Sequence, residues 1–330
     1  MERDVLKRMR LRVESVREIL RRPFQHDSGV LAGILAALII IFGAATRGGS
    51  LTVRNWSSIL HAVSMRGIVT MGQTFVMLTT NLDLSVGGMA LLGNMVGASI
   101  MTGQTGFPVK AIALTLLFGI GVGLGNGILV TRLRIPSLIV TLATWQMLEG
   151  GAWTMTGGWP IVDLPKELAV FTRGMVGPIP VAAIVFIVVI VVSHFVLGYT
   201  TFGRSVYAVG GNRVVAWLSG VDVKNTTLFV FVISGFCAAL ASIINLSRTM
   251  SGTLVAGLGF ELDSITAAAI GGVSLAGGRG TVIGAVLGVF IVAVINNGMN
   301  RLRIIPAWQL VVRAAIIISA VAVDYIRRRG

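Results

Sequence analysis

Two apolar stretches, VAAIVFIVVIVVSHFVLG at residues 181–198 and LFVFVISGFCAALASII at residues 228–244, decide the fold class of this protein. Segments of about 17 to 25 apolar residues are long enough to cross a bilayer as a helix. Such segments must be helical, because backbone polar groups in lipid find partners only within their own segment. The two stretches therefore predict an all-α integral membrane protein.

The composition extends this prediction to the whole chain. Of its 330 residues, 55% are hydrophobic and only 12% are charged, which is typical of membrane proteins rather than soluble domains. The 42 glycines fit too, because small residues let membrane helices approach closely. The net charge is +14, but the cations cluster at the edges of apolar segments. Lipid headgroups and membrane orientation explain that placement, so we expect no nucleic-acid partner.

The chain holds about ten candidate transmembrane helices, and some are short or broken enough by glycine and proline to be re-entrant. With the N-terminus in the cytoplasm, the larger share of the 27 lysines and arginines falls on the cytoplasmic side. The positive-inside rule therefore predicts that both termini are cytoplasmic. The candidate spans lie near 29–46, 57–79, 84–102, 109–130, 135–154, 178–198, 227–247, 262–277, 280–297 and 306–326.

The segments outside this membrane domain (residues 29–326) are short. Residues 1–28 carry apolar residues at helical spacing between arginines, which predicts a basic amphipathic helix on the cytoplasmic leaflet. A solvated tail is the alternative, and a signal peptide is not expected. Residues 327–330 form a cytoplasmic tail. The longest outer loop, near 155–177, should contain a short helix that starts close to Pro165.

No motif for catalysis or for phosphate binding is present. GxxxxGK[ST] is absent, and GGVSLAGGRGTVIG (271–284) follows a membrane segment rather than a strand. We interpret Gly280, Gly284 and Gly288 as a face for close helix packing. Cys237 is expected to be a buried small hydrophobe. The three histidines lack ligand spacing, so we expect no metal site and no cofactor bound by this chain.

Several polar residues lie at membrane depth. Asp83, in NLDLSVGG (81–88), either caps the helix that follows it or lies beside a polar pathway, and both can hold. Each of the other polar residues at membrane depth, taken alone, more often makes a hydrogen bond between helices or anchors a helix at the membrane interface. A tryptophan beside amide side chains nevertheless suits a sugar. The candidate substrate pathway comprises Asn81, Asp83, Asn94, Trp145, Gln146 and Asn297.

A polar island, TTFGRSVYAVGGNRVVAWLSGVDVKNTT at residues 200–227, separates the two opening stretches. GGN (210–212) predicts a turn, and RVVAWLSG predicts a short helix that ends at Gly220. A two-turn helix with exposed apolar side chains is not stable alone in water. It should therefore lie on the membrane surface, on this protein's own helices or in a partner's groove.

Over about residues 29–326, the chain resembles the permease subunits of ATP-binding-cassette importers of the ribose/xylose/arabinose/galactoside type. The order and spacing of four segments together carry the resemblance. These are LDLSVGG (82–88), GRSVYAVGGNRVVAWLSGV (203–221), AAAIGGVSLAGGRGTVIGAVLG (267–288) and INNGMNRLRIIPAWQLVVRA (295–314).

The resemblance implies a permease in the cytoplasmic (inner) membrane that pairs with a second copy or a paralogue. It would take a monosaccharide, such as a pentose, from an extracytoplasmic binding protein. ATP and Mg would be bound by a separate ATPase subunit, which in one form has two fused nucleotide-binding domains. Residues 199–226 would then be the cytoplasmic coupling loop that docks in this ATPase. The coupling residues would be Gly210, Gly211, Asn212, Arg213, Val214, Val215, Trp217, Leu218, Ser219 and Gly220.

The sequence departs from the family pattern in two places. After GGN the family commonly has an acidic residue and alanines, whereas here Arg213, Val214 and Val215 follow. This reversal of charge predicts a matching acidic residue on the ATPase. Before LDLS the family usually has glycines, whereas here residues 79–81 are Thr-Thr-Asn, which weakens the transfer of any particular sugar.

Other functions remain open at this point. The same kind of importer could carry a nucleoside, a polyol or a furanone-type signal. A different class is a proton-coupled secondary transporter that uses a buried carboxylate, with Asp83, Glu149 or the Glu261/Asp263 pair as candidates. Such a transporter has no use for a coupling loop. A membrane enzyme would need a catalytic constellation that the sequence lacks.

Overall fold

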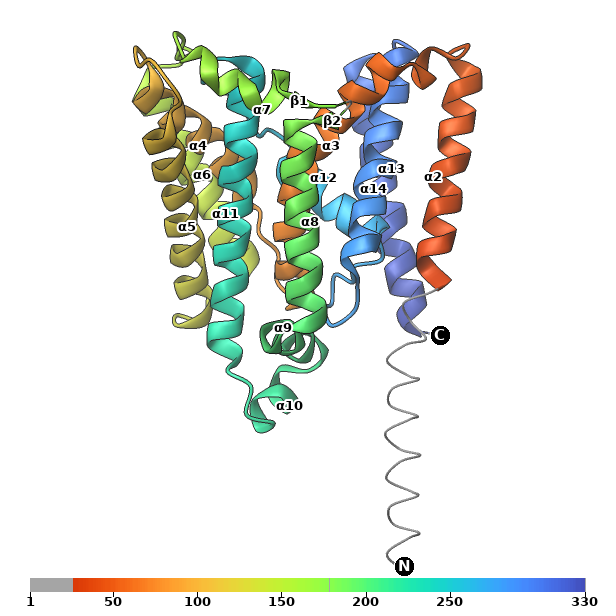
Figure 1. Cartoon of the computed structure of the whole chain (residues 1–330). Helices are drawn as coiled ribbons and strands as arrows, with labels where there is room; N and C mark the ends of the chain where they lie inside the picture. Colours follow the sequence, from red (N-terminus) through yellow and green to blue (C-terminus); the bar gives the residue numbers. More distant parts are fainter. Residues whose placement is uncertain (1–25, 178, 330) are drawn as a thin grey trace, which may run out of the picture.

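The computed structural model describes residues 26–177 and 179–329, so the amphipathic helix expected at 1–28 falls almost entirely outside the described residues. The described chain is mostly helical, with one short hairpin (Figure 1). Its main helices are α2 (His26–Ala45), α3 (Val53–Leu78), α4 (Ser85–Met101), α5 (Val109–Thr131), α6 (Ser137–Thr156), α8 (Val181–Tyr199), α9 (Thr201–Gly211), α10 (Arg213–Leu218), α11 (Val223–Thr249), α12 (Phe260–Ile270), α13 (Val282–Arg301) and α14 (Pro306–Arg329). The minor elements are η2 (Gly49–Leu51), η3 (Lys166–Ala169), α7 (Val170–Arg173) and the paired strands β1 (Met175–Val176) and β2 (Ile179–Pro180).

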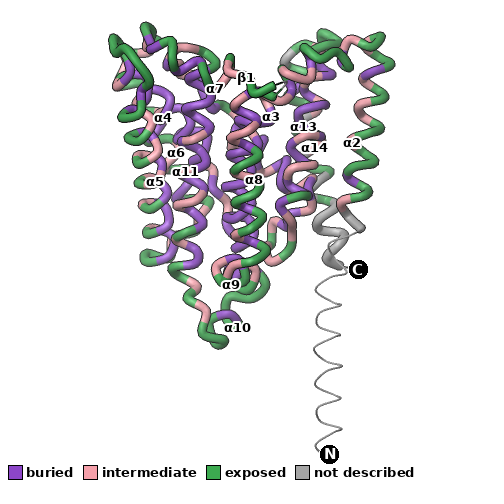
Figure 2. The backbone as a smooth tube through the Cα atoms, in the orientation of Figure 1, coloured by how far each residue is buried: buried purple, intermediate pink, exposed green. Residues whose placement is uncertain are grey.

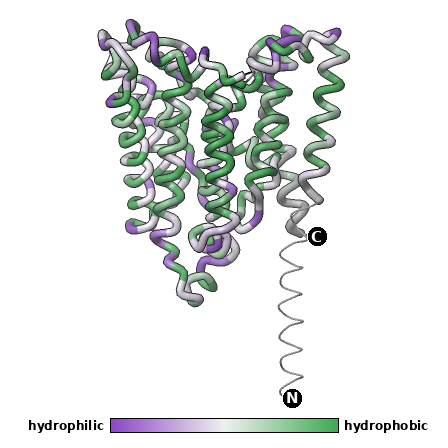
Figure 3. The backbone as a smooth tube through the Cα atoms, viewed as in Figure 1, coloured by the Kyte–Doolittle hydropathy of each residue, from purple (hydrophilic) through white to green (hydrophobic). Residues whose placement is uncertain are grey.

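Five of these helices are long and apolar enough to cross a membrane: α2, α5, α8, α11 and α13. The apolar side chains of α2, α5 and α8 are largely exposed, whereas α11 and α13 are mostly buried (Figures 2 and 3). An apolar surface of this extent belongs against lipid rather than water. The prediction of an all-α membrane protein therefore fits the structure.

The segment predicted to span at 262–277 is not a single helix. α12 ends at Ile270, and an irregular loop, the α12–α13 loop (residues 271–281), replaces its second half. Gly272 has a φ of 83°, a left-handed conformation that ends a helix and that glycine adopts without strain. With 11 residues, α12 extends about 16 Å, too short to cross the hydrocarbon core.

Glycines let the central helices pack with their backbones almost in contact. A Cβ on Gly123 of α5 would lie 2.3 Å from the carbonyl oxygen of Phe231 on α11. A Cβ on Gly288 of α13 would lie 1.9 Å from the carbonyl oxygen of Ala267 on α12, and Gly284 meets Gly271 in the same way. The prediction of a close-packing helix face is therefore confirmed for Gly284 and Gly288. It is wrong for Gly280, which lies in the α12–α13 loop before α13 begins.

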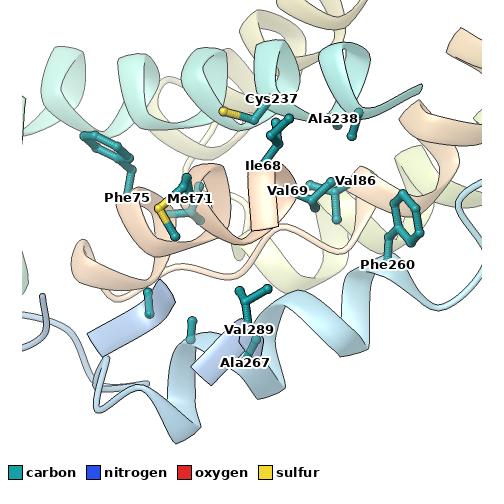
Figure 4. Close-up of a cluster of buried hydrophobic side chains, with 14 of the residues drawn as sticks. Ile68, Val69, Met71, Phe75, Val86, Cys237, Ala238, Phe260, Ala267 and Val289 are labelled. Carbon is teal, nitrogen blue, oxygen red and sulfur yellow. The ribbon is translucent and has the colours of Figure 1, made fainter. Parts of the chain in front are cut away.

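The core lies where α3 meets α11, α12 and α13 (Figure 4). Ile68, Met71 and Phe75 of α3 are fully or almost fully buried there. Cys237 on α11 lies in the same cluster as a free, buried thiol, as expected for a small hydrophobe. α3 is thus the helix around which the described bundle is built.

The ends of the helices define two faces of the molecule. α9 and α10 extend beyond the lower ends of the long helices, and α2 begins and α14 ends at that same end (Figure 1). At the opposite end, the loop after α6 contains η3 and α7, and η3 starts directly after Pro165. The short helix predicted in this loop is confirmed.

Candidate functional site

The polar island folds into two successive helices, α9 and α10, separated by Asn212. The Asn212 backbone is extended, and its side-chain oxygen accepts hydrogen bonds from the backbone N–H groups of Val214 at 2.9 Å and Val215 at 3.1 Å. This is the geometry of an N-cap. The prediction of a turn at GGN is wrong for its glycines, because Gly210 and Gly211 lie inside α9 and only Asn212 breaks the helix.

α10 presents four large apolar side chains to the outside. We call Val214, Val215, Trp217 and Leu218 the docking face; Trp217 is 67% exposed and Leu218 is 72% exposed. On this helix only Ala216 is buried, and Gly220, with a φ of 83°, follows its end. A helix this short is held by its cap and by what it packs against, since two turns are unstable in isolation. The apolar exposure predicted for this segment is therefore confirmed.

We call α9 and α10 together (residues 201–218) the docking unit, and α9 is the part that joins it to the bundle. A Cβ on Gly210 would lie 1.7 Å from the Leu78 carbonyl oxygen at the end of α3 and 2.4 Å from the Gly278 nitrogen. Gly278 N–H itself donates to the Leu78 carbonyl at 3.0 Å. The Tyr207 hydroxyl donates to the Gly280 carbonyl at 2.9 Å, and burial raises the pKa of Tyr207 to about 12. Movement of α9 must therefore be felt by α3 and by the α12–α13 loop.

Arg213 is exposed, yet its side chain reaches back to the end of α3. One guanidinium nitrogen (Nη2) lies 3.4 Å from the Thr79 carbonyl oxygen, to which it donates. Partial burial lowers the pKa of Arg213 from its ordinary value, although a guanidinium remains charged at neutral pH. The two departures from the family pattern, at residues 79–81 and at Arg213, are thus neighbours in space. The matching acidic residue on the ATPase stays a prediction.

Asp83 lies at the centre of a buried hydrogen-bond network. Its Oδ1 accepts from the Ser85 backbone N–H at 3.0 Å and from the Ser85 hydroxyl at 2.5 Å, and its Oδ2 accepts from the Ser234 hydroxyl on α11 at 2.7 Å. Asn126 of α5 donates to Ser85, and Thr144 of α6 donates to Asn126. The network joins four helices, so Asp83 has a structural role, as considered for it. The N-cap position of α4 itself is occupied by Leu84.

The structure does not bring the six candidate pathway residues together. Asn94 is buried and accepts from the Thr253 backbone N–H at 2.9 Å. Asn297 exchanges two side-chain hydrogen bonds with Asn55, at 2.9 and 3.0 Å. Asn81, beside Asp83, bonds back to Thr79. Trp145 lies on α6 against Gly88, and the adjacent Gln146 is exposed.

Sequence reasoning missed an ion pair inside the bundle. Arg66 on α3 meets Asp263 on α12, with Nε 2.9 Å from Oδ2, and the Arg66 side chain is still 28% exposed. Glu261, in the first turn of α12, is partly exposed, but its Oε2 atom is buried and has no hydrogen-bond partner. The sequence does signal the need for a partner, because Arg66 is a cation in the middle of an apolar helix. Its partner lies almost two hundred residues away and is visible only in the fold.

Two of the four segments that carry the family resemblance meet at the end of α3, shortly before a third segment, LDLSVGG, begins. The GGN segment of α9 and the α12–α13 loop converge there around Leu78, Gly210 and Gly278. Comparison with known proteins agrees: the family described as "Branched-chain amino acid transport system / permease component" matches residues 55–321. The chain belongs to this permease family.

The permease has relatives that align over almost its whole length. It is 37% identical to the ribose import permease protein RbsC of Bacillus subtilis (strain 168), over 90% of this chain and 92% of the relative. It is 35% identical to the D-allose transport system permease protein AlsC of Escherichia coli (strain K12), over 88% and 89%. It is 32% identical to the xylose transport system permease protein XylH of the same organism, over 91% and 92%. No solved structure matches the permease.

Proposed function

We propose that this chain is the membrane-spanning subunit of an ATP-driven importer that moves a monosaccharide into the cytoplasm. The observation that carries the proposal is the docking face on α10, which is connected through α9 to the end of α3 and to the α12–α13 loop. An exposed apolar helix with such a connection suits a separate ATPase subunit that binds ATP and Mg and pushes on it. The family membership supports the same proposal.

The class of cargo is inferred from the relatives. Those described above are named for ribose, allose and xylose, which favours a pentose or a related sugar. A nucleoside, a polyol or a furanone-type signal is the alternative cargo for the same machine. The Arg66–Asp263 pair and the nearby Glu261 supply hydrogen-bonding groups of the kind that a sugar needs while it crosses the bundle.

The arrangement in the membrane is part of the proposal. We place α9, α10, the start of α2 and the end of α14 in the cytoplasm, with about ten spans and re-entrant pieces between them. A second permease copy or a paralogue completes the pathway. An extracytoplasmic sugar-binding protein delivers cargo at the opposite face. The permease itself lies in the cytoplasmic (inner) membrane of the cell.

One observation favours a second candidate, a proton-coupled secondary transporter. Three carboxylates, Glu149, Glu261 and Asp263, lie close enough within the bundle to interact electrostatically. Proton relays use such groups. The docking face would then have no function, and uptake would stop with an uncoupler but continue in the presence of vanadate. Vanadate-sensitive uptake supports the importer instead.

The importer proposal is tested at the docking face. Trp217→Asp or Leu218→Asp places a charge where an apolar contact is needed, so both variants should lose co-purification with the ATPase subunit and ATP-driven uptake. Membrane insertion and the unfolding midpoint should be retained, because both side chains are exposed. Val176→Asp is the matched control, since Val176 is 61% exposed in β1, at the other end of the molecule (Figure 1). Normal uptake by the α10 variants contradicts the proposal.

A further inference from the structure

A basic pocket of about 360 Å³ lies at the base of the docking unit. The end of α5, the α5–α6 loop, α10 and the start of α11 enclose it, and it contains Arg134, Arg213 and Lys224. Within the described part of the chain, none of these three cations has a carboxylate partner. Like charges gathered around one pocket repel each other, so an anion in the pocket would stabilise the arrangement.

A second observation independently indicates a ligand. Thr227 on α11 is 2% exposed and lines the pocket, yet its hydroxyl has no hydrogen-bond partner. Buried polar groups in native proteins are almost always hydrogen-bonded, and an unpaired one costs about 1–3 kcal/mol. The nearest carboxylate on the same segment, Asp222, is occupied by the Asn225 backbone and side chain at 3.0 and 2.7 Å. The lining of the pocket therefore offers three cations and an unpaired hydroxyl but no carboxylate.

The position of the pocket restricts what can enter it. α5 ends at Thr131 and α11 begins at Val223, and both helices are apolar enough to span the membrane. The pocket thus lies where apolar helices give way to polar loops, which is the depth of lipid headgroups. Its volume is larger than a single carboxylate side chain needs, and three cations exceed the charge of one carboxylate.

We propose that this pocket binds a phosphate group, held by Arg134, Arg213 and Lys224 and by the Thr227 hydroxyl. Arg213 belongs to α10, whereas the other three belong to the α5–α6 loop and α11, so the bound phosphate fastens the docking unit to the bundle. The phosphate can come from an anionic phospholipid or from a soluble phosphate compound. Which leaflet the pocket faces rests on the proposed function, but the binding of phosphate does not.

The test measures two probes on the purified full-length chain in a neutral detergent. Phosphatidylglycerol binding is followed by native mass spectrometry against phosphatidylcholine, and inorganic phosphate binding by equilibrium dialysis at constant ionic strength. Arg134→Gln and Lys224→Gln should each weaken binding by about ten- to a hundredfold, as expected for a lost hydrogen bond to a charged group. Thr227→Val, which keeps the side-chain shape, should weaken it by about two- to tenfold.

Arg204→Gln is the matched control, because Arg204 is an exposed cation on α9 that does not line the pocket. Its binding of both probes should equal that of the parent chain. Phosphatidylglycerol binding alone assigns the site to a lipid headgroup, and binding of both probes assigns it to phosphate from either source. The proposal is overturned if neither probe binds, or if the pocket variants bind as Arg204→Gln does. In that case, an acidic segment of a partner protein is the occupant that suits the three cations.

Discussion

At the scale of single residues, Asp83 shows how a candidate pathway residue can be a structural one. Its carboxylate accepts three hydrogen bonds, one of them from Ser234, and is fully buried. The Gln73 amide, oriented with its nitrogen toward the Asp83 carbonyl, also pairs with both backbone groups of Asp83, at 3.0 and 3.2 Å. Three of the roughly four hydrogen bonds that a carboxylate can accept are therefore already made within the protein.

Asp83→Ala should therefore reduce stability before it affects selectivity. The change leaves the buried Ser85 and Ser234 hydroxyls without their acceptor, at about 1–3 kcal/mol for each unsatisfied group. We expect a lower unfolding midpoint in detergent and a lower yield from membranes. Glu167→Ala, which removes an exposed carboxylate on η3, is the control and should change neither quantity. Normal stability with lost uptake would instead return Asp83 to the substrate pathway.

At the scale of elements, the contact of α9 with the bundle has no room for a side chain at Gly210. Gly210 touches the backbone of both α3 and the α12–α13 loop, whereas the adjacent Gly211 has open space around it. The two neighbouring glycines therefore have different roles. One is required by a close approach, and the other lies on the open side of the same helix.

This difference gives a paired prediction. In Gly210→Ala the new Cβ meets the Leu78 carbonyl, so α9 must shift; overpacking costs about 1–3 kcal/mol and should uncouple ATP hydrolysis from uptake. Gly211→Ala should be neutral or stabilising by up to about 1 kcal/mol, because alanine favours helix. Unfolding midpoints and uptake per ATP hydrolysed, measured side by side, compare the two. Equal behaviour of the two variants would contradict the role of the α9 contact.

At the scale of the whole molecule, the docking unit and β1 lie at opposite ends of a lipid-exposed bundle (Figure 1). The proposed orientation places the docking unit in the cytoplasm. Since Cys237, the chain's single cysteine, is buried, introduced cysteines can report accessibility without interference.

Ser219→Cys should react with a membrane-impermeant maleimide only after the cytoplasmic membrane is permeabilised. Val176→Cys, in β1 at the end of the molecule opposite α10 (Figure 1), should react in cells whose cytoplasmic membrane is intact. Both positions are exposed in the fold, so lack of reaction reflects the membrane rather than burial. Chain without an introduced cysteine is the control and should remain unlabelled. The reverse pattern would place α10 outside and would exclude contact with a cytoplasmic ATPase.

The sequence by itself determined the membrane class, the positions of most helices, the exposed apolar helix of the polar island and the family. These follow from local composition and spacing, since an apolar segment in lipid has to be helical whatever surrounds it. Only the tertiary structure decided that α12 stops at Ile270, that Arg213 reaches back to Thr79, and that Arg66 pairs with Asp263. It also decided that Asp83 is satisfied by Ser234. The physical reason is distance along the chain: a buried charge or an empty space beside a glycine is defined by its neighbours, and these neighbours arrive from helices far away in the sequence.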